Sequence, residues 1–112
     1  MSLSGLKGSF PLTLESIDKE IRKSTPGTFT LGDVTDGKFK TLYVGRADGD
    51  LKRELQQRIG QASRFKYQEF DNAKSAYEKQ CELFHFLKPR GNTQHPQVPG
   101  TKDWKCPDCG IS

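Results

Sequence analysis

Apolar residues recur at helical spacing, three or four positions apart, in three segments of this chain. These segments predict helices over residues 13–23, 50–61 and 72–87, with Thr13 and Asn72 as the N-caps of the first and the last. A polar residue inside the apolar face of a helix is typical of either a hydrogen-bonded core amide or a functional site. The predicted inner face of the last helix consists of Ala73, Ala76, Tyr77, Phe84 and Leu87, with the polar Gln80 among them.

Apolar and polar residues alternate over residues 28–34 and 39–45, and this pattern predicts two strands. Between them lies the pair Asp36-Gly37, which favours the tight turn of an antiparallel hairpin. Residues 64–70 predict a third strand. Together the elements predict an α/β fold, in which a small three-stranded antiparallel sheet is flanked by helices.

A chain of 112 residues has the size of one domain. We expect a loose, Gly/Ser-rich N-terminus over residues 1–12 and a single domain over residues 13–112. Prolines and glycines predict an irregular tail from about residue 89. We expect Trp104 and the pair Cys106 and Cys109 of this tail to pack near the end of the last helix.

Charge and cysteine content narrow the class of protein. The net charge of +4 and the pI of about 9.0 permit contact with a polyanion without requiring it. No apolar run approaches the roughly 18 residues of a membrane span, and the N-terminus has no apolar signal segment. Three cysteines, an odd number, fit a reducing compartment, so we expect a cytoplasmic protein without membrane contact.

Four short motifs stand in order on the predicted elements. They are GTF at residues 27–29, YVG at 43–45, DLKREL at 50–55 and PRGN at 89–92. With these motifs in this order, the chain resembles the GIY-YIG nuclease superfamily. Its tail, with NTQHP and WKCPDC, resembles a small-protein branch of that superfamily. The resemblance implies a GIY-YIG-like sheet and a domain built to hold a phosphodiester.

Members of that superfamily cleave phosphodiester bonds with one metal ion. A hairpin tyrosine helps to activate or position water, a helix arginine steadies the phosphate, and a glutamate on a later helix holds Mg²⁺. In this chain the resemblance assigns the hairpin positions to Phe29 and Tyr43, the arginine position to Glu54 and the metal-ligand position to Gln80. Arg58 stands where a histidine is often found.

Three of the four reactive positions therefore carry a different residue. Phe29 lacks a hydroxyl, Glu54 reverses the charge facing a phosphate, and the amide of Gln80 is a poor substitute for a carboxylate toward a hard cation. Arg53 is displaced by about 100° around the helix and should point elsewhere. The resemblance thus implies a binding domain that has lost cleavage; the alternative is an active Mg²⁺-dependent nuclease with an unusual pocket.

Binding residues follow from the same motifs and from charge. Phosphate contacts by the basic side chains would fit DNA or RNA, and an acidic protein surface is the other partner that we consider. The alternative for the cations is a solvated helix face, and for Asn92 it is a cap on the loop after the last helix. The candidate binding residues are Gly45, Arg46, Lys52, Arg53, Arg58 and Asn92.

A zinc site is a separate hypothesis. Cys106 and Cys109 have the two-residue spacing of a zinc knuckle, and His85 and His95 could supply the other ligands. The alternatives are two uncoordinated thiols or a reversible disulfide. Cys81 lies beside the apolar stripe of the last helix and is expected to be buried.

Overall fold

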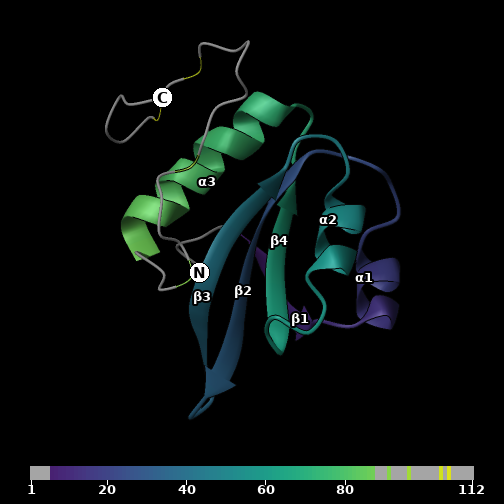
Figure 1. Cartoon of the computed structure of the whole chain (residues 1–112), viewed down its shortest axis with the longest axis vertical. Coiled ribbons are helices and arrows are strands. Elements are labelled where there is room, and N and C mark those ends of the chain that lie inside the picture. Colours follow the sequence, from purple (N-terminus) through teal and green to yellow (C-terminus); the bar gives the residue numbers. More distant parts are fainter. Residues whose placement is uncertain (1–5, 88–90, 92–95, 97–103, 105, 107–112) are drawn as a thin grey trace.

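The computed structural model describes residues 6–87 together with residues 91, 96, 104 and 106. The described residues form a four-stranded antiparallel sheet in the order β1-β4-β2-β3, with three helices (Figure 1). The elements in chain order are β1 (Lys7–Pro11), α1 (Leu14–Glu20), β2 (Gly27–Thr35), β3 (Lys38–Ala47), α2 (Leu51–Gln57), β4 (Arg64–Glu69) and α3 (Ala73–Leu87).

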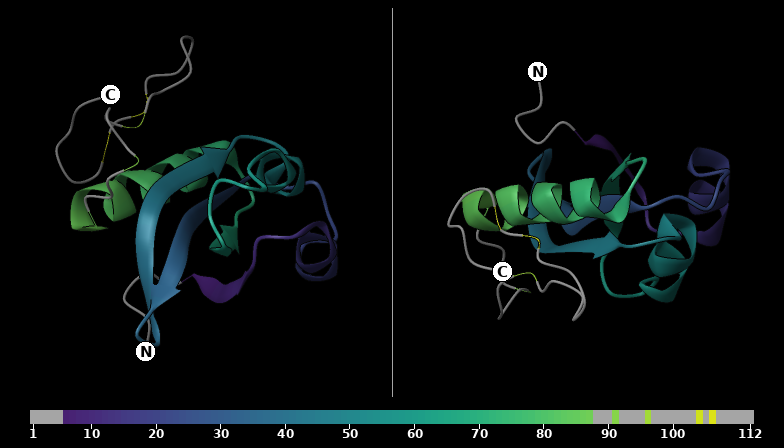
Figure 2. Two further views of the ribbon diagram at one scale, coloured as in Figure 1. Left: turned by 60° about the horizontal axis from the view of Figure 1, so that its bottom comes forward. Right: turned by 90° about the horizontal axis from the view of Figure 1, so that it is seen from above.

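The sheet separates two layers of helix. Helices α1 and α2 lie on one face and α3 crosses the other, as Figures 1 and 2 show from different sides. The face under α1 and α2 carries the larger core, whose buried residues are Leu12, Ile17, Ile21, Phe29, Leu31, Ala47, Leu51, Leu55, Phe65 and Tyr67. Under α3 the apolar contacts are fewer, and a small cluster joins Leu6, Val44 and Leu83.

The prediction of three strands was wrong, because residues 7–11 of the expected loose N-terminus form strand β1. This strand pairs with β4 at the edge of the sheet, with a shift of register between Gly8 and Phe10. Phe10 packs against the larger core, and the neighbouring Leu6 is buried on the other side. The shifted register breaks the alternation of apolar and polar residues, so β1 carries no sequence pattern of a strand.

The remaining elements lie where the periodicity predicts them, with shorter helices. The hydroxyl of Thr13 accepts a hydrogen bond from the backbone of Ser16, and the side chain of Asn72 accepts one from Ser75, which confirms both N-caps. The hairpin turn is also confirmed, because its two central residues have the positive φ angles of a primed turn. On α3, Gln80 is buried together with Ala76, Tyr77, Cys81 and Leu83.

Candidate functional site

Strands β2 and β3 and helix α2 bring Phe29, Tyr43, Glu54 and Arg58 together in what we call the Arg58 cluster. Arg58 donates from Nη2 to Glu54 Oε1 over 3.0 Å and to the hydroxyl of Tyr43 over 3.4 Å. Its guanidinium carbon lies 4.9 Å from the centre of the Tyr43 ring. The residues at the arginine and histidine positions of the resemblance thus form an ion pair beside the tyrosine.

Gly45 completes this cluster because its backbone lies against both aromatic rings. A Cβ atom at position 45 would lie 2.5 Å from the Phe29 ring and 2.8 Å from the Tyr43 ring. The two ring centres are 6.2 Å apart, and Phe29 is fully buried. Aromatic packing therefore explains the glycine of the YVG motif.

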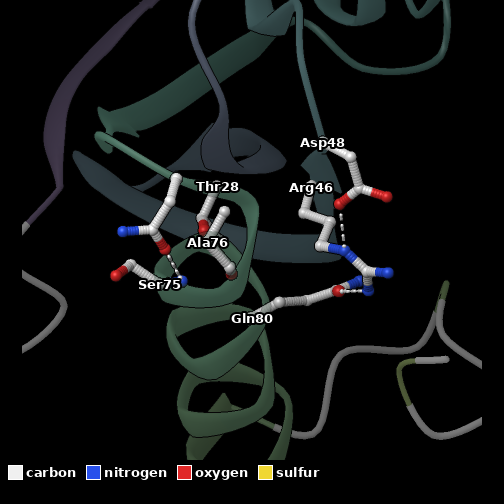
Figure 3. A network of polar contacts seen from close by, with 7 residues as sticks. Thr28, Arg46, Asp48, Ser75, Ala76 and Gln80 are labelled. Carbon is white, nitrogen blue, oxygen red and sulfur yellow. Dashed lines mark hydrogen bonds and ion pairs between the residues drawn. The ribbon is translucent and has the colours of Figure 1, made fainter. Parts of the chain in front are cut away.

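A second group, the Arg46 cluster, lies between β3 and α3 and contains Arg46, Asp48, Tyr77 and Gln80. Figure 3 shows Arg46, Asp48 and Gln80 of this cluster. Arg46 donates from Nε to Asp48 Oδ1 and from Nη1 to Gln80 Oε1, both over 2.7 Å. The guanidinium also lies 5.1 Å from the centre of the Tyr77 ring. Burial raises the pKa of the Tyr77 hydroxyl above its ordinary value, and a hydrogen bond with Cys81 raises it further.

Helix α3 is fixed on the sheet next to this cluster by a buried polar contact. The hydroxyl of Thr28 donates to the carbonyl oxygen of Ala76 over 2.7 Å, and Figure 3 shows the pair beside Gln80. Since Ala76 and Gln80 are one turn apart, this bond helps to set the position of the Gln80 amide over β3. The structure thus makes Gln80 a hydrogen-bonded amide of the interior, one of the two alternatives for it.

The two clusters lie on opposite faces of the sheet. Tyr43 and Arg46 are three residues apart on β3, and side chains at odd separations along a strand point to opposite faces. Tyr43 packs against the core under α1 and α2, whereas Arg46 bonds to α3. The structure brings Phe29, Tyr43 and Glu54 together but does not bring Gln80 to them.

Most of the predicted phosphate-binding cations have a carboxylate partner. Lys52 Nζ lies 3.1 Å from Asp18 Oδ1, and Arg46 and Arg58 pair with Asp48 and Glu54. Arg53 is exposed and forms no ion pair within the described residues.

Two further exposed cations, which the motifs did not indicate, lie in a segment that is hydrogen-bonded to the start of α2. Arg22 and Lys23 are exposed in the segment that follows α1. This segment is held at the start of α2, because Leu51 donates its backbone N–H to the carbonyl oxygen of Thr25 over 2.9 Å. We call Arg22, Lys23 and Arg53 the basic edge; only the fold indicates it, since 30 positions separate Lys23 from Arg53.

Part of the PRGN motif contacts the sheet. Gly91 donates its N–H to the carbonyl oxygen of Leu42 over 2.6 Å, and a Cβ on Gly91 would lie 2.5 Å from that oxygen. The glycine thus permits a close backbone approach to β3. Asn92 lies outside the described residues.

The structure describes only two of the four residues of the zinc hypothesis, His85 and Cys106. Cys106 is buried in a cluster with Tyr77 and Cys81, and the Trp104 ring centre lies 5.7 Å from that of Tyr77. Trp104 therefore packs on the first half of α3, and the prediction of a contact near the helix end was wrong. His85 is half-buried with its ring against Phe84, whereas His95 and Cys109 lie outside the described residues.

The comparisons with known proteins give no relative: no family model, no curated protein and no solved structure matches this chain. Within the part of the chain that the structure describes, no helix is long and apolar enough to span a bilayer.

Proposed function

We propose that this chain is a GIY-YIG-like domain that binds a nucleic-acid backbone without cleaving it. The order hairpin, helix, strand and helix, over which the motifs are distributed, agrees with the order of β2, β3, α2, β4 and α3. This agreement supports the resemblance at the level of the elements. The chemistry of the site depends on its side chains.

The observation that carries the proposal is the contact between Gln80 and Arg46. At the position where the resemblance implies a metal-binding carboxylate, a neutral amide directs its oxygen to a guanidinium at 2.7 Å. An oxygen that accepts from a cation is a poor ligand for Mg²⁺, which prefers carboxylates and water. Without a metal at this position, the charge that develops during phosphodiester cleavage has no stabilising cation.

The Arg58 cluster supports the same conclusion. Glu54 places a carboxylate where the resemblance implies a phosphate-binding arginine, and it directs Arg58 toward itself and Tyr43. Removal of one preorganised electrostatic group typically costs about 10²–10³ in rate, and both the metal and the arginine positions are affected here. We therefore expect hydrolysis below detection.

For the ligand, the basic edge favours a phosphate backbone. Its three cations are exposed and form no ion pair with the described carboxylates, and the whole chain carries a net charge of +4. Lys and Arg contacts of this type bind phosphates without selecting bases. We expect affinity for DNA or RNA with little dependence on base sequence.

Two measurements test the proposal. Incubation of the full chain with supercoiled plasmid and Mg²⁺ should leave the plasmid intact; nicking that is lost on Tyr43→Phe would show an active nuclease. Fluorescence anisotropy with labelled DNA and RNA should show an affinity that falls steeply with salt. Arg53→Ala should reduce the slope of log affinity against log salt by about one.

Lys74→Ala provides the matched control, because Lys74 is also exposed but lies on α3, on the other side of the sheet. This variant should keep the slope of the unaltered chain. An affinity that is absent for every nucleic acid at low salt would refute the proposed ligand and favour an acidic protein surface as the partner. Equal effects of Arg53→Ala and Lys74→Ala would refute the basic edge as the binding surface.

A further inference from the structure

Phe39, near the turn of the β2–β3 hairpin, is a large aromatic residue outside the apolar cores. None of the three apolar clusters of the described chain contains it, and it is only half-buried. Its partner across the hairpin, Val34, is 47% exposed. This end of the hairpin extends past the three helices (Figure 1). Burial in a core therefore does not account for this aromatic residue.

Lys66 of β4 lies over the ring of Phe39, with its Nζ atom 4.7 Å from the ring centre. Since the neighbouring Phe65 and Tyr67 belong to the core under α1 and α2, Lys66 and the Phe39 ring lie on the opposite face of the sheet. The ring also lies over Gly32, where a Cβ atom would be 2.7 Å from the ring Cζ atom. The glycine thus gives the ring room on the strand, and an ammonium group covers it in place of a core side chain.

At this end of the hairpin, the described residues on the Phe39 face include two cations and no carboxylate. The cations are Arg64 and Lys66 of β4, and Lys66 takes part in none of the described ion pairs. Asp33 points to the other face, where it accepts a hydrogen bond from the Ser63 hydroxyl over 2.6 Å. Asp36 lies in the turn, beyond the last strand pair. The Phe39 face is therefore suited to an anionic ligand with an aromatic part.

We propose that this end of the hairpin binds single-stranded nucleic acid, with one base stacked on Phe39 and Lys66 on an adjacent phosphate. The inference rests on the proposed function and deepens it by naming the form of nucleic acid. The base takes the place of the ammonium over the ring, and the flexible lysine moves to the phosphate. Every base has a π face, so stacking adds affinity without selecting a sequence. Bases in a duplex are stacked on their neighbours and are not free to occupy this position.

Fluorescence anisotropy with three labelled probes of equal length tests the inference. The probes are oligo(dT), a deoxyribose-phosphate oligomer without bases, and a DNA duplex. The unaltered chain should bind oligo(dT) more tightly than the base-free oligomer. Phe39→Leu should lower the affinity for oligo(dT) at least about fivefold, which is the lower end of the usual contribution of base–aromatic stacking, and should leave the other two affinities unchanged.

Three further variants support the assignment to the ring. Val34→Thr is the matched control, because it changes the partner of Phe39 and keeps the ring, and it should leave every affinity unchanged. Lys66→Gln should reduce the slope of log affinity against log salt for oligo(dT) by about 0.7. Phe39→Trp should retain the affinity, and its added tryptophan fluorescence should change when oligo(dT) binds but not when the base-free oligomer binds. This last readout decides the inference even where Phe39→Leu does not fold.

Equal affinity of the unaltered chain for oligo(dT) and the base-free oligomer would overturn the inference, as would an unchanged affinity in Phe39→Leu. If Arg53→Ala still reduces the salt slope in either case, the proposed function stands without this site. The converse result, an effect of Phe39→Leu with none of Arg53→Ala, would retain this site and refute the basic edge. A chain that binds none of the probes at low salt would overturn both proposals.

Discussion

Gly45 shows how a residue of a functional motif can be explained by packing. The resemblance connects this glycine with a nuclease pocket, whereas the structure places the rings of Phe29 and Tyr43 where its Cβ would be. A phenylalanine in place of a tyrosine has the same size but no hydroxyl, so the ring fills the space without needing a hydrogen-bond partner. In this chain Gly45 therefore permits an aromatic core contact.

We expect Gly45→Ala to destabilise the protein by about 1–3 kcal/mol, because both rings would have to move away from the new methyl group. Gly49→Ala is the matched control, since no heavy atom lies within 4 Å of the corresponding Cβ position. The control should change the free energy of unfolding by less than about 1 kcal/mol, in the stabilising direction. Urea denaturation of the two variants measures the difference; equal stability would contradict the packing explanation.

At the scale of elements, the turns and helix caps follow from local sequence signals, whereas the strand β1 depends on pairing between distant segments. The turn at Asp36-Gly37 and the caps at Thr13 and Asn72 depend on neighbouring residues, and they were predicted correctly. Strand β1 was missed because it exists only through its pairing with β4, far along the chain. The same reason hides the Arg46–Gln80 contact, since sequence alone does not show which face of β3 lies under α3.

Tyr67 connects two such elements, β4 and the end of α1. Its hydroxyl lies 3.3 Å from the carbonyl oxygen and from the carboxylate of Glu20. Burial, with the charge of Glu20 as a second cause, raises the pKa of Tyr67 to about 12, from an ordinary value of about 10. The folded protein therefore holds this proton more strongly than the unfolded chain does.

The sign of the pH dependence follows from this difference. The contribution of Tyr67 to stability is fully present below pH about 10, declines as the pH rises from about 10 to about 12, and is lost above that range. Across this range the unaltered protein should lose more stability than Tyr67→Phe, which has no proton to release at that position. Urea denaturation of both proteins in steps between pH 8 and 12 tests this; parallel curves would contradict it.

At the scale of the whole molecule, the two faces of the sheet have different environments. The face under α1 and α2 is an apolar core, whereas the face under α3 combines small apolar clusters with the polar contacts of Thr28, Arg46 and Gln80. Strand β3 takes part in both, because alternate residues of one strand point to opposite faces. The sequence indicates each candidate position separately. Only the fold shows that the sheet separates Gln80 from Tyr43.

This separation gives a prediction about introducing the residues that the nuclease resemblance implies. The double substitution Glu54→Arg with Gln80→Glu supplies the arginine and the carboxylate that the resemblance implies. We nevertheless expect no Mg²⁺-dependent nicking of supercoiled plasmid, because residue 80 lies on the opposite face from Tyr43. A carboxylate at position 80 would pair with the Arg46 guanidinium, which already lies 2.7 Å from the Gln80 oxygen, and would thereby bind Mg²⁺ weakly.

A further substitution separates this pairing from the geometry. Adding Arg46→Gln to the double variant removes the competing cation, so Mg²⁺ affinity measured by calorimetry should rise while plasmid cleavage stays undetectable. Mg²⁺-dependent cleavage by the double variant would contradict the prediction, since it would require the glutamate and Tyr43 to act on one phosphate across the sheet. Cleavage only in the triple variant would identify Arg46, instead of the separation of the two clusters, as the obstacle to cleavage.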